Sequence, residues 1–435
     1  MSFFFKSSQR LYPWSVACML WFIGFLNFAD RQVIYSIFPL LEKEFYFSKF
    51  QLGLIGSAFL WVYAVFGIFA GIFSDRYCRK TTIIGGCFFW SLMTWGTAWC
   101  SQFWQFVIVR GVDGIGEAFY LPAAMSLLAD YHGTKTRSTA FSFHFSGIFL
   151  GIIAGSSLGA FLAQHFGWRF PFYFFGGLGI LLSFIFSKWL REPKRGASEQ
   201  ETSEQITLVA HKENQHLKPI LEIITHLCHR PEALLLMLAF GSESIVSYAF
   251  FTWLPTFFYE KFHLSLTESG FSAALYLQLG CIVGTLFFGK ITDRFLSNMP
   301  GGRLISQIIG LILGLFFILF IGRAANVNIL IAALFCFGFG KGGYIGGIFP
   351  ALYETVPLKQ RGSASGFNSF IGSIAGGLGP TIIGAIMTFG KTGTTMERMS
   401  HALSWSAFFY LLAICFLIGA FVLNRRKKKL YGCSR

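Results

Sequence analysis

The chain has 435 residues, 54% of them hydrophobic and 13% charged, and its mean hydropathy is +0.58. This composition excludes an ordinary water-soluble protein, because apolar residues this abundant and this evenly spread indicate that lipid surrounds most of the chain. The formal net charge of +15 does not indicate nucleic-acid binding, because the Lys and Arg residues gather in alternate loops between apolar segments.

Segments of about 20 apolar residues, the length that crosses a bilayer core, recur along nearly the whole chain. In chain order, the first half is expected to cross the membrane at residues 12–36, 51–73, 81–99, 103–129, 138–162 and 169–188. The second half is expected to cross it at residues 231–259, 267–291, 304–322, 326–353, 362–389 and 401–423. The predicted fold class is an all-α integral membrane protein of about twelve transmembrane helices.

Polar residues outside these spans indicate the domain organisation. Residues 191–230 form the only long polar stretch, and they are predicted to be a cytoplasmic linker. The linker separates an N-terminal six-helix half, residues 1–190, from a C-terminal half, residues 231–424, and residues 425–435 form a basic tail. By the positive-inside rule the loops rich in Lys and Arg are cytoplasmic, which predicts cytoplasmic termini in a multi-pass protein of the plasma (inner) membrane.

The two halves carry matching landmarks. Asp75 and Arg76 follow the second span, and Asp293 and Arg294 follow the eighth. The residues that enter the fifth and eleventh spans match at one constant offset: Asp130, Lys135 and Arg137 correspond to Glu354, Lys359 and Arg361. A duplicated six-helix unit predicts two pseudo-symmetric halves with a binding site near the bilayer midplane between them.

Ionisable residues inside the spans are candidate functional residues, because each costs about 2.5 to 3.5 kcal/mol at the centre of an inserted helix. They are Asp30, Arg31, Arg110, Asp113, Glu117, His144, Glu243 and Lys341. Arg110 and Glu117 lie two helical turns apart and share a face, so a proton on Glu117 would free Arg110 to hold an anion. The alternative is an interhelical salt bridge, for instance between Arg110 and Asp30, that only holds helices together.

The sequence Gly71-Ile-Phe-Ser-Asp-Arg-Tyr-Cys-Arg-Lys80 resembles the loop motif of the major facilitator superfamily, with Cys78 where the motif usually has glycine. The resemblance covers essentially the whole chain and implies a secondary transporter that works without ATP, by alternating access. Glycines of the fifth span also resemble the family's gating helix, but the proline of that motif, which would favour an antiporter, is missing. The residues predicted to gate the cytoplasmic side are Asp75, Arg76, Arg137, Asp293, Arg294 and Arg361.

Two branches of this superfamily resemble the motifs in the first and fourth spans, Asn27-Phe-Ala-Asp-Arg31 and Arg110 to Glu117-Ala. They are the proton-coupled organic-anion symporters and the spinster-type lysolipid transporters. In both, the matching acids are implicated in coupling and the matching arginines in binding. The resemblance therefore implies proton coupling by Asp30 and Glu117 and substrate binding by Arg31 and Arg110. Further candidate substrate-binding residues are Asn27, Tyr120, His144, Lys341 and Glu243.

The sequence predicts no metal, cofactor or enzymatic activity. His226, Cys228 and His229 have no further matched ligand pair, and Gly338-Phe-Gly-Lys341-Gly-Gly lacks the spacing of a phosphate-binding loop. The function predicted is proton-coupled symport of a small organic anion by a monomer in the lipid bilayer, with protons and the solute as partners. A spinster-like transporter of a lysolipid or other amphiphile is the alternative.

Overall fold

The computed structural model describes residues 2–133, 136–194, 230–296, 299, 301–356 and 361–432. These residues are helical almost throughout and contain no strand. Ten of the described helical stretches are long and apolar enough to cross a membrane. Helix α4 and the broken helix α5–α6 complete two sets of six, which confirms the predicted fold class.

The described part of the N-terminal half contains eight helices: α1 (Ser2–Ser36), α2 (Phe38–Phe45), α3 (Lys49–Arg76), α4 (Arg79–Thr97), α5 (Phe103–Ala118), α6 (Tyr120–Tyr131), α7 (Arg137–Phe166) and α8 (Phe170–Trp189). The described part of the C-terminal half contains α11 (Pro231–Phe262), α12 (Leu266–Ile291), a π-helical turn (Thr292–Leu296), α13 (Gly302–Ile321), α14 (Val327–Ile345), α15 (Ile348–Thr355), α16 (Arg361–Phe389), α17 (Thr395–Trp405) and α18 (Ala407–Gly432). The predicted linker lies mostly outside the described residues.

Three predicted spans are broken helices, which corrects the expectation of continuous ones. The fourth span breaks after Ala118, because Pro122 lacks the N–H that would bond to the Ala118 carbonyl and its ring crowds that carbonyl. Pro350 has the same effect on Gly346 in the tenth span. The twelfth span breaks at Ser406, whose hydroxyl donates to the Leu403 carbonyl at 2.5 Å.

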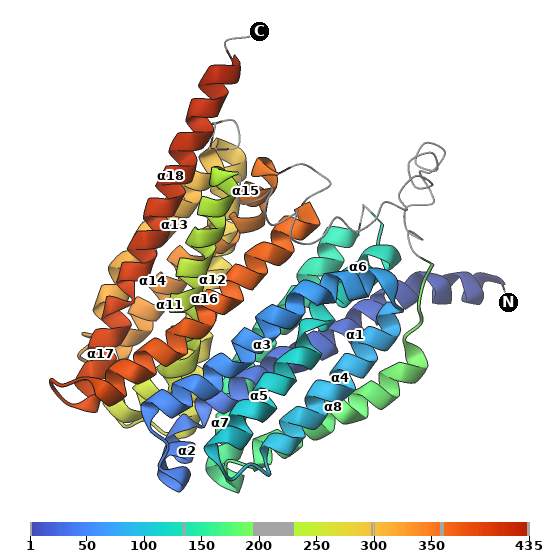
Figure 1. The fold of residues 1–435 in the computed structure, drawn as a ribbon. Helices are drawn as coiled ribbons and strands as arrows, with labels where there is room; N and C mark the ends of the chain where they lie inside the picture. Colours follow the sequence, from blue (N-terminus) through green and yellow to red (C-terminus); the bar gives the residue numbers. More distant parts are fainter. Residues whose placement is uncertain are drawn as a thin grey trace.

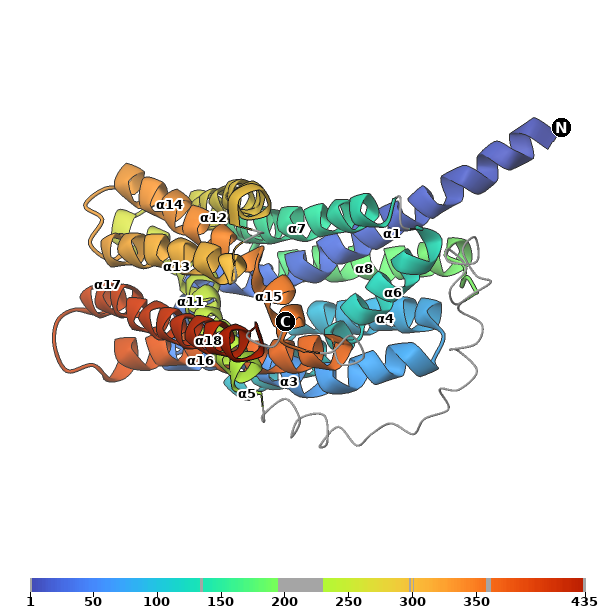
Figure 2. The same cartoon turned by 90° about the horizontal axis from the view of Figure 1, so that it is seen from above.

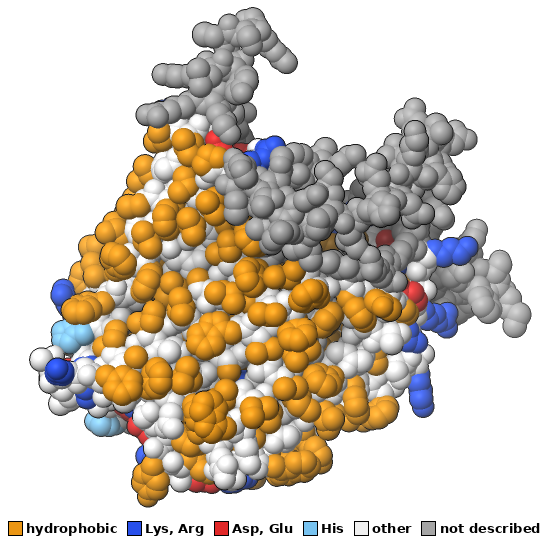
Figure 3. Space-filling view, viewed as in Figure 1, with side chains coloured by type: hydrophobic (Ala, Val, Ile, Leu, Met, Phe, Trp, Pro, Cys, Tyr) orange, Lys and Arg blue, Asp and Glu red, His pale blue; other side chains and the backbone are white. Residues whose placement is uncertain are grey.

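The surface of the protein is that of a membrane protein. Hydrophobic side chains cover its side, and Lys, Arg, Asp, Glu and His gather toward its two ends (Figure 3). Large apolar residues such as Phe184, Phe316 and Leu286 are more than half exposed, which water would disfavour and lipid favours.

The two halves lean together around α2 and spread apart toward the end that carries the C-terminus (Figures 1 and 2). Helix pairs α3–α16, α7–α12 and α1–α11 join them. Along α3 and α16, contacts run from Phe50 N–H, which donates to the Thr388 hydroxyl at 2.9 Å, to Trp61, whose ring N–H donates to the Ile374 carbonyl at 3.2 Å. The halves are therefore in contact at the α2 end, called the closed end below, and their helices diverge toward the other end, called the open end (Figure 1).

Glycines allow α1 and α7 to pack backbone to backbone. Gly151 and Gly155 on α7 lie against the carbonyls of Phe25 and Ala29, and a Cβ added at either position would overlap those atoms. This close approach fixes the position of α1, the helix that carries Asp30 and Arg31.

Gly155→Ala is expected to lower stability by about 1–3 kcal/mol, because the new methyl group must push α1 away. Gly177→Ala is the matched control: a Cβ there meets nothing within 4 Å, so alanine should be neutral or stabilise by up to about 1 kcal/mol. Thermal unfolding of the purified variants in detergent, followed by tryptophan fluorescence, measures the difference. Equal melting temperatures would contradict the packing argument.

Candidate functional site

The central pair of the N-terminal half joins Arg31 on α1 to Glu117 in the last turn of α5. The Arg31 Nε donates to Glu117 Oε2 at 3.1 Å, and its NH2 group contacts the same oxygen. Arg31 is 5% exposed and Glu117 1%. Two opposite charges buried together stabilise one another, and removing one leaves the other buried without a counter-ion.

A second pair lies within α5, where Arg110 NH1 contacts Asp113 Oδ2 at 2.5 Å. The Phe59 ring lies between the two arginines, 4.5 Å from the Arg31 guanidinium and 5.0 Å from that of Arg110. In this structure Arg110 forms its ion pair with Asp113, and among the described residues it forms none with Glu117 or Asp30, although its charge acts on both. A coupling role of Arg110 with Glu117 stays a prediction. Sequence spacing placed Arg110 and Glu117 on one face but could not show that α1 supplies a nearer cation.

Asp30 is a third buried carboxylate in the same region. Its Oδ2 accepts a hydrogen bond from the Thr94 hydroxyl on α4 at 3.3 Å, and its Oδ1 has no hydrogen-bond partner among the described residues. The two arginines form ion pairs with Glu117 and Asp113, so Asp30 forms no ion pair among the described residues, although the Arg110 charge acts on it. The cluster therefore has three acids and two permanent cations.

Arg31 faces the space between the two halves. Its guanidinium lies 4.5 Å from the Phe28 ring and 5.2 Å from the Tyr63 ring, and it interacts electrostatically with Tyr248 on α11 of the other half. These three aromatic side chains are only half-buried, although they lie on inner helices. They border the region where a solute would meet Arg31.

The C-terminal half has its own buried ion pair, between Lys341 on α14 and Glu243 on α11. Lys341 Nζ lies 3.6 Å from Glu243 Oε1 and donates to the Ser247 hydroxyl at 2.5 Å, while that hydroxyl bonds to Glu243. Both residues were predicted only as candidate substrate-binding residues, and the structure pairs them between two helices of the C-terminal half.

Three other candidates of the N-terminal half lie apart from this contact network. Tyr120 donates its hydroxyl to the Leu20 carbonyl at 2.7 Å, and its ring packs 5.9 Å from that of His144. Neither ring nitrogen of His144, nor Nδ2 of Asn27, has a hydrogen-bond partner among the described residues. Asn27 lies one helical turn before Arg31 on the same face of α1.

The predicted gating residues lie at the open end. Arg137 donates to the His132 carbonyl at 3.2 Å and to the Ala129 carbonyl at 3.3 Å, within its own half. Asp293 and Arg294 are exposed in the π-helical turn. The side chains of Asp75, Arg76 and Arg361 lie outside the described residues. The gate stays a prediction, since it would form when this end closes.

Arg79 has a structural role that the motif did not reveal. Its buried guanidinium contacts Asp130 at the end of α6 and Glu192 after α8, the latter at 2.8 Å. Burial alone would raise the pKa of Glu192, but hydrogen bonds from the Lys80 N–H and Arg79, together with the Arg79 charge, outweigh it and lower that pKa. Arg79 thus fastens the start of the predicted linker to the N-terminal half.

Sequence reasoning also missed a salt bridge at the closed end, where Lys49 appeared to be an ordinary loop cation. Lys49 is buried as the first residue of α3, and its Nζ contacts Glu42 of α2 at 2.5 Å and Glu260 of α11. The neighbouring Lys43 donates to the Tyr259 hydroxyl at 2.8 Å. Lys49 therefore links the two halves on the side opposite the predicted gate.

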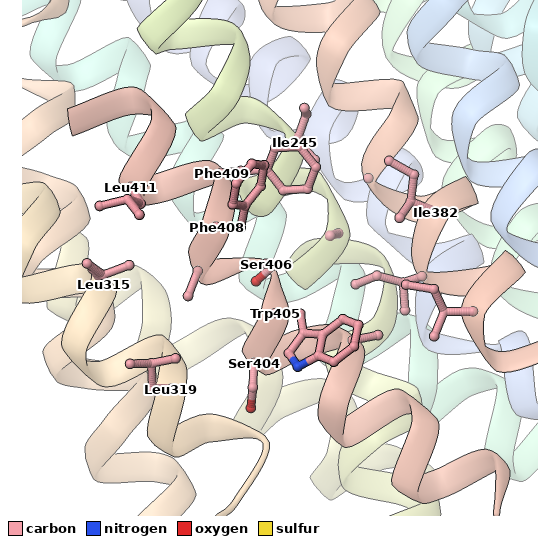
Figure 4. A pocket seen from close by; sticks show the side chains of 16 residues that line it. Ile245, Leu315, Leu319, Ile382, Ser404, Trp405, Ser406, Phe408, Phe409 and Leu411 are labelled. Atoms are coloured by element: carbon pink, nitrogen blue, oxygen red, sulfur yellow. The ribbon is translucent and has the colours of Figure 1, made fainter. Parts of the chain in front are cut away.

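A separate apolar cavity of about 680 Å³ lies within the C-terminal half, among α11, α13, α16, α17 and α18. Figure 4 shows Trp405, Phe408 and Phe409 pointing toward it from the α17–α18 break, opposite Ile245 and Ile382. No ionisable residue is among those that line it.

Comparison with known proteins identifies the family. The model described as "Major Facilitator Superfamily" matches residues 20–380 and 277–431. The chain belongs to the major facilitator superfamily. It is a multi-pass membrane transporter, and the family model covers both halves.

Several curated members of the superfamily are similar over about three quarters or more of their length. The chain is 27% identical to the "Probable galactarate/D-glucarate transporter GudP" of Bacillus subtilis, over 88% of this chain and 86% of that one. It is 26% identical to the "Ascorbate transporter, chloroplastic" of Arabidopsis thaliana, over 94% and 74%. It is 27% identical to "Protein spinster homolog 1" of Homo sapiens, over 93% and 78%.

Solved structures share the fold. A bacterial homolog of the human lysosomal transporter spinster, in an inward-facing and occupied conformation, superimposes with a TM-score of 0.80 at 21% identity, over 94% of this chain and 97% of that one. Its unoccupied form gives a TM-score of 0.76 at 22% identity, over 95% and 97%. Both branches that the motifs resemble are thus represented among the similar proteins.

Proposed function

We propose that this transporter carries a small organic anion together with protons, in the same direction across the membrane. The observation that supports this most is the buried Arg31–Glu117 pair, next to the unpaired Asp30. Arg31 can pair either with the Glu117 carboxylate or with a carboxylate of a solute, and it can therefore bind an organic acid. The similarity to transporters named for galactarate, D-glucarate and ascorbate supports the same class of solute.

Protonation of Glu117 is the proposed coupling step. As a carboxylate, Glu117 neutralises Arg31 and competes with the solute for it. Once Glu117 takes a proton, Arg31 would be a buried cation without a counter-ion, which is costly, so an anionic solute binds in its place. Asp30 is the proposed site of a second proton, because it is buried and its Oδ1 has no hydrogen-bond partner among the described residues.

Orientation follows from the charge distribution. We place the termini and the basic loops in the cytoplasm, in a plasma (inner) membrane, with the bounds of the two halves and the linker as predicted from the sequence. The structure then represents a state closed to the outside and open to the cytoplasm. Alternating access requires the closed end to open, and Lys49 holds it shut through Glu42 and Glu260.

Lys49→Gln is expected to shift the protein toward the outward-open state, because Glu42 and Glu260 lose the cation that joins them. The reporter is Thr252→Cys, on a buried residue of α11 facing Gly56 of α3, in a protein whose other cysteines are replaced by serine. We expect roughly tenfold faster labelling by an impermeant maleimide added outside, equivalent to ~1.4 kcal/mol.

The matched control is Arg169→Gln, which removes an exposed ion pair to Glu44 that lies within one half. It should leave the labelling rate of the reporter unchanged. A Lys49→Gln protein that labels no faster than the parent would show that this salt bridge is not part of the outer gate.

A lysolipid transporter is the second candidate, supported by the apolar cavity at the α17–α18 break and by the similarity to spinster homologs. The cavity can hold an acyl chain but offers no charge to a headgroup. The buried Arg31 and Arg110 favour a small anion more directly, because a guanidinium group binds a negative charge and gains nothing from an acyl chain.

Uptake by proteoliposomes containing the purified protein distinguishes the two candidates. The panel is D-glucarate, ascorbate, glucose and lysophosphatidylcholine, each tested for saturable uptake and for competition. We expect an acid to be taken up and glucose not to compete. Competition by glucose at similar concentrations would contradict the anion proposal, and movement of lysolipid alone would favour the second candidate.

A further inference from the structure

Two of the buried ion pairs, Arg31–Glu117 and Lys341–Glu243, occupy related positions with reversed polarity. The offset that relates Asp130 to Glu354 also relates Glu117 on α5 to Lys341 on α14. Each of these residues pairs with the first long helix of its own half, Glu117 with Arg31 on α1 and Lys341 with Glu243 on α11. Each half therefore holds one cation that is neutralised by one carboxylate, on helices related by the internal repeat.

Lys341, like Arg31, has a single carboxylate as its counter-ion among the described residues. Lys341 Nζ lies 4.7 Å from the Phe251 ring and bonds to the Ser247 hydroxyl, so its one described counter-ion is Glu243. Titratable neighbours of the pair from other positions are Cys281 on α12, Tyr344 on α14 and Tyr410 on α18. These side chains are uncharged at neutral pH. Loss of the Glu243 charge would thus leave Lys341 in need of an anion, as loss of the Glu117 charge does for Arg31.

Two neighbouring aromatic rings on α11 connect the surroundings of the two cations. Tyr248 on α11 interacts with Arg31, and its ring lies 6.1 Å from that of Phe251, which contacts Lys341. Tyr248 and Phe251 are three residues apart, about 4.5 Å along the helix axis, and both are half-buried. A solute that lies along these two rings would have Arg31 near one end and Lys341 near the other.

We propose that the solute has two acidic groups, one bound by Arg31 of the N-terminal half and the other by Lys341 of the C-terminal half. This inference rests on the proposed function and narrows its solute class to diacids. A diacid held in this way joins the two halves, while a monoacid satisfies only one of the two cations.

The test compares D-glucarate with D-gluconate, a diacid and a monoacid on the same six-carbon skeleton, in proteoliposomes with the full chain. The wild type should take up glucarate with at least about tenfold higher apparent affinity, the gain expected from one charge-assisted hydrogen-bonded contact. Lys341→Gln should lower the affinity for glucarate to that for gluconate and leave the affinity for gluconate nearly unchanged. The double variant Glu243→Gln/Lys341→Gln should behave identically, and it leaves no unpaired buried charge if the single variant folds poorly.

The outcomes separate this inference from the proposed function. Uptake of both acids with equal affinity, or an equal loss for both in the Lys341 variants, overturns the two-charge solute while organic-anion transport stands. No saturable uptake of either acid, with lysolipid transported instead, overturns the proposed function and the diacid with it.

Discussion

Glu117→Gln is expected to abolish accumulation of the solute driven by a pH gradient while leaving exchange of the solute across the membrane. Glutamine has the shape of the protonated acid but cannot release a proton, so Arg31 stays available to the anion in every state. Radiolabelled uptake into proteoliposomes, with the inside more alkaline, measures accumulation. Counterflow in the absence of a gradient measures exchange.

The matched control for this variant is Glu44→Gln, which removes an acid that is 41% exposed and pairs with Arg169 outside the cluster. It should accumulate the solute as the wild type does. If Glu117→Gln still concentrates the solute under an imposed proton gradient, Glu117 is not the coupling residue.

Arg31→Lys is expected to weaken the apparent affinity for the solute by about 10- to 100-fold. The Arg31 guanidinium contacts Glu117 through two nitrogens, a planar arrangement that also fits an incoming carboxylate, whereas an ammonium group is a point charge. Losing one charge-assisted hydrogen bond costs about 1.5–3 kcal/mol, which corresponds to that range of affinity. The concentration dependence of initial uptake gives the value.

Arg110→Lys serves as the comparison, because Arg110 contacts Asp113 within α5 through NH1 and forms no ion pair with the described residues of the other half. Its effect on affinity should be clearly smaller than that of Arg31→Lys. A larger effect of Arg110→Lys would make Arg110 the solute-binding arginine and would contradict the assignment to Arg31.

The sequence alone was enough to predict the fold, because its evidence is local and repeated. Apolar segments of bilayer length and the matched Asp75 and Asp293 turns indicate twelve spans in two halves without any knowledge of contacts. The breaks after Ala118 and near Gly346 depend on where a proline falls within a turn. They could have been inferred from Pro122 and Pro350.

The site was predictable as a set of residues but not as a set of pairs. Asp30, Arg31, Arg110 and Glu117 could be identified from the sequence, because a charged side chain inside the membrane costs free energy and is rarely retained without a function. The partner of each residue depends on how the helices rotate and pack. Gly151 and Gly155 bring α7 against α1 and so fix the position of Arg31, an effect of close packing that spacing does not reveal. Lys49 was missed for the same reason, since its partners Glu42 and Glu260 lie on two other helices.

Proton movement coupled to solute entry tests the central claim most directly. Lightly buffered proteoliposomes receive an acid that the uptake panel identifies as a solute, D-glucarate first, and the external pH is recorded. If protons enter with the anion, the wild-type protein should give a solute-dependent rise in external pH. Glu117→Gln should give none. Solute entry without proton movement, or the same pH change in the variant, would contradict the central claim.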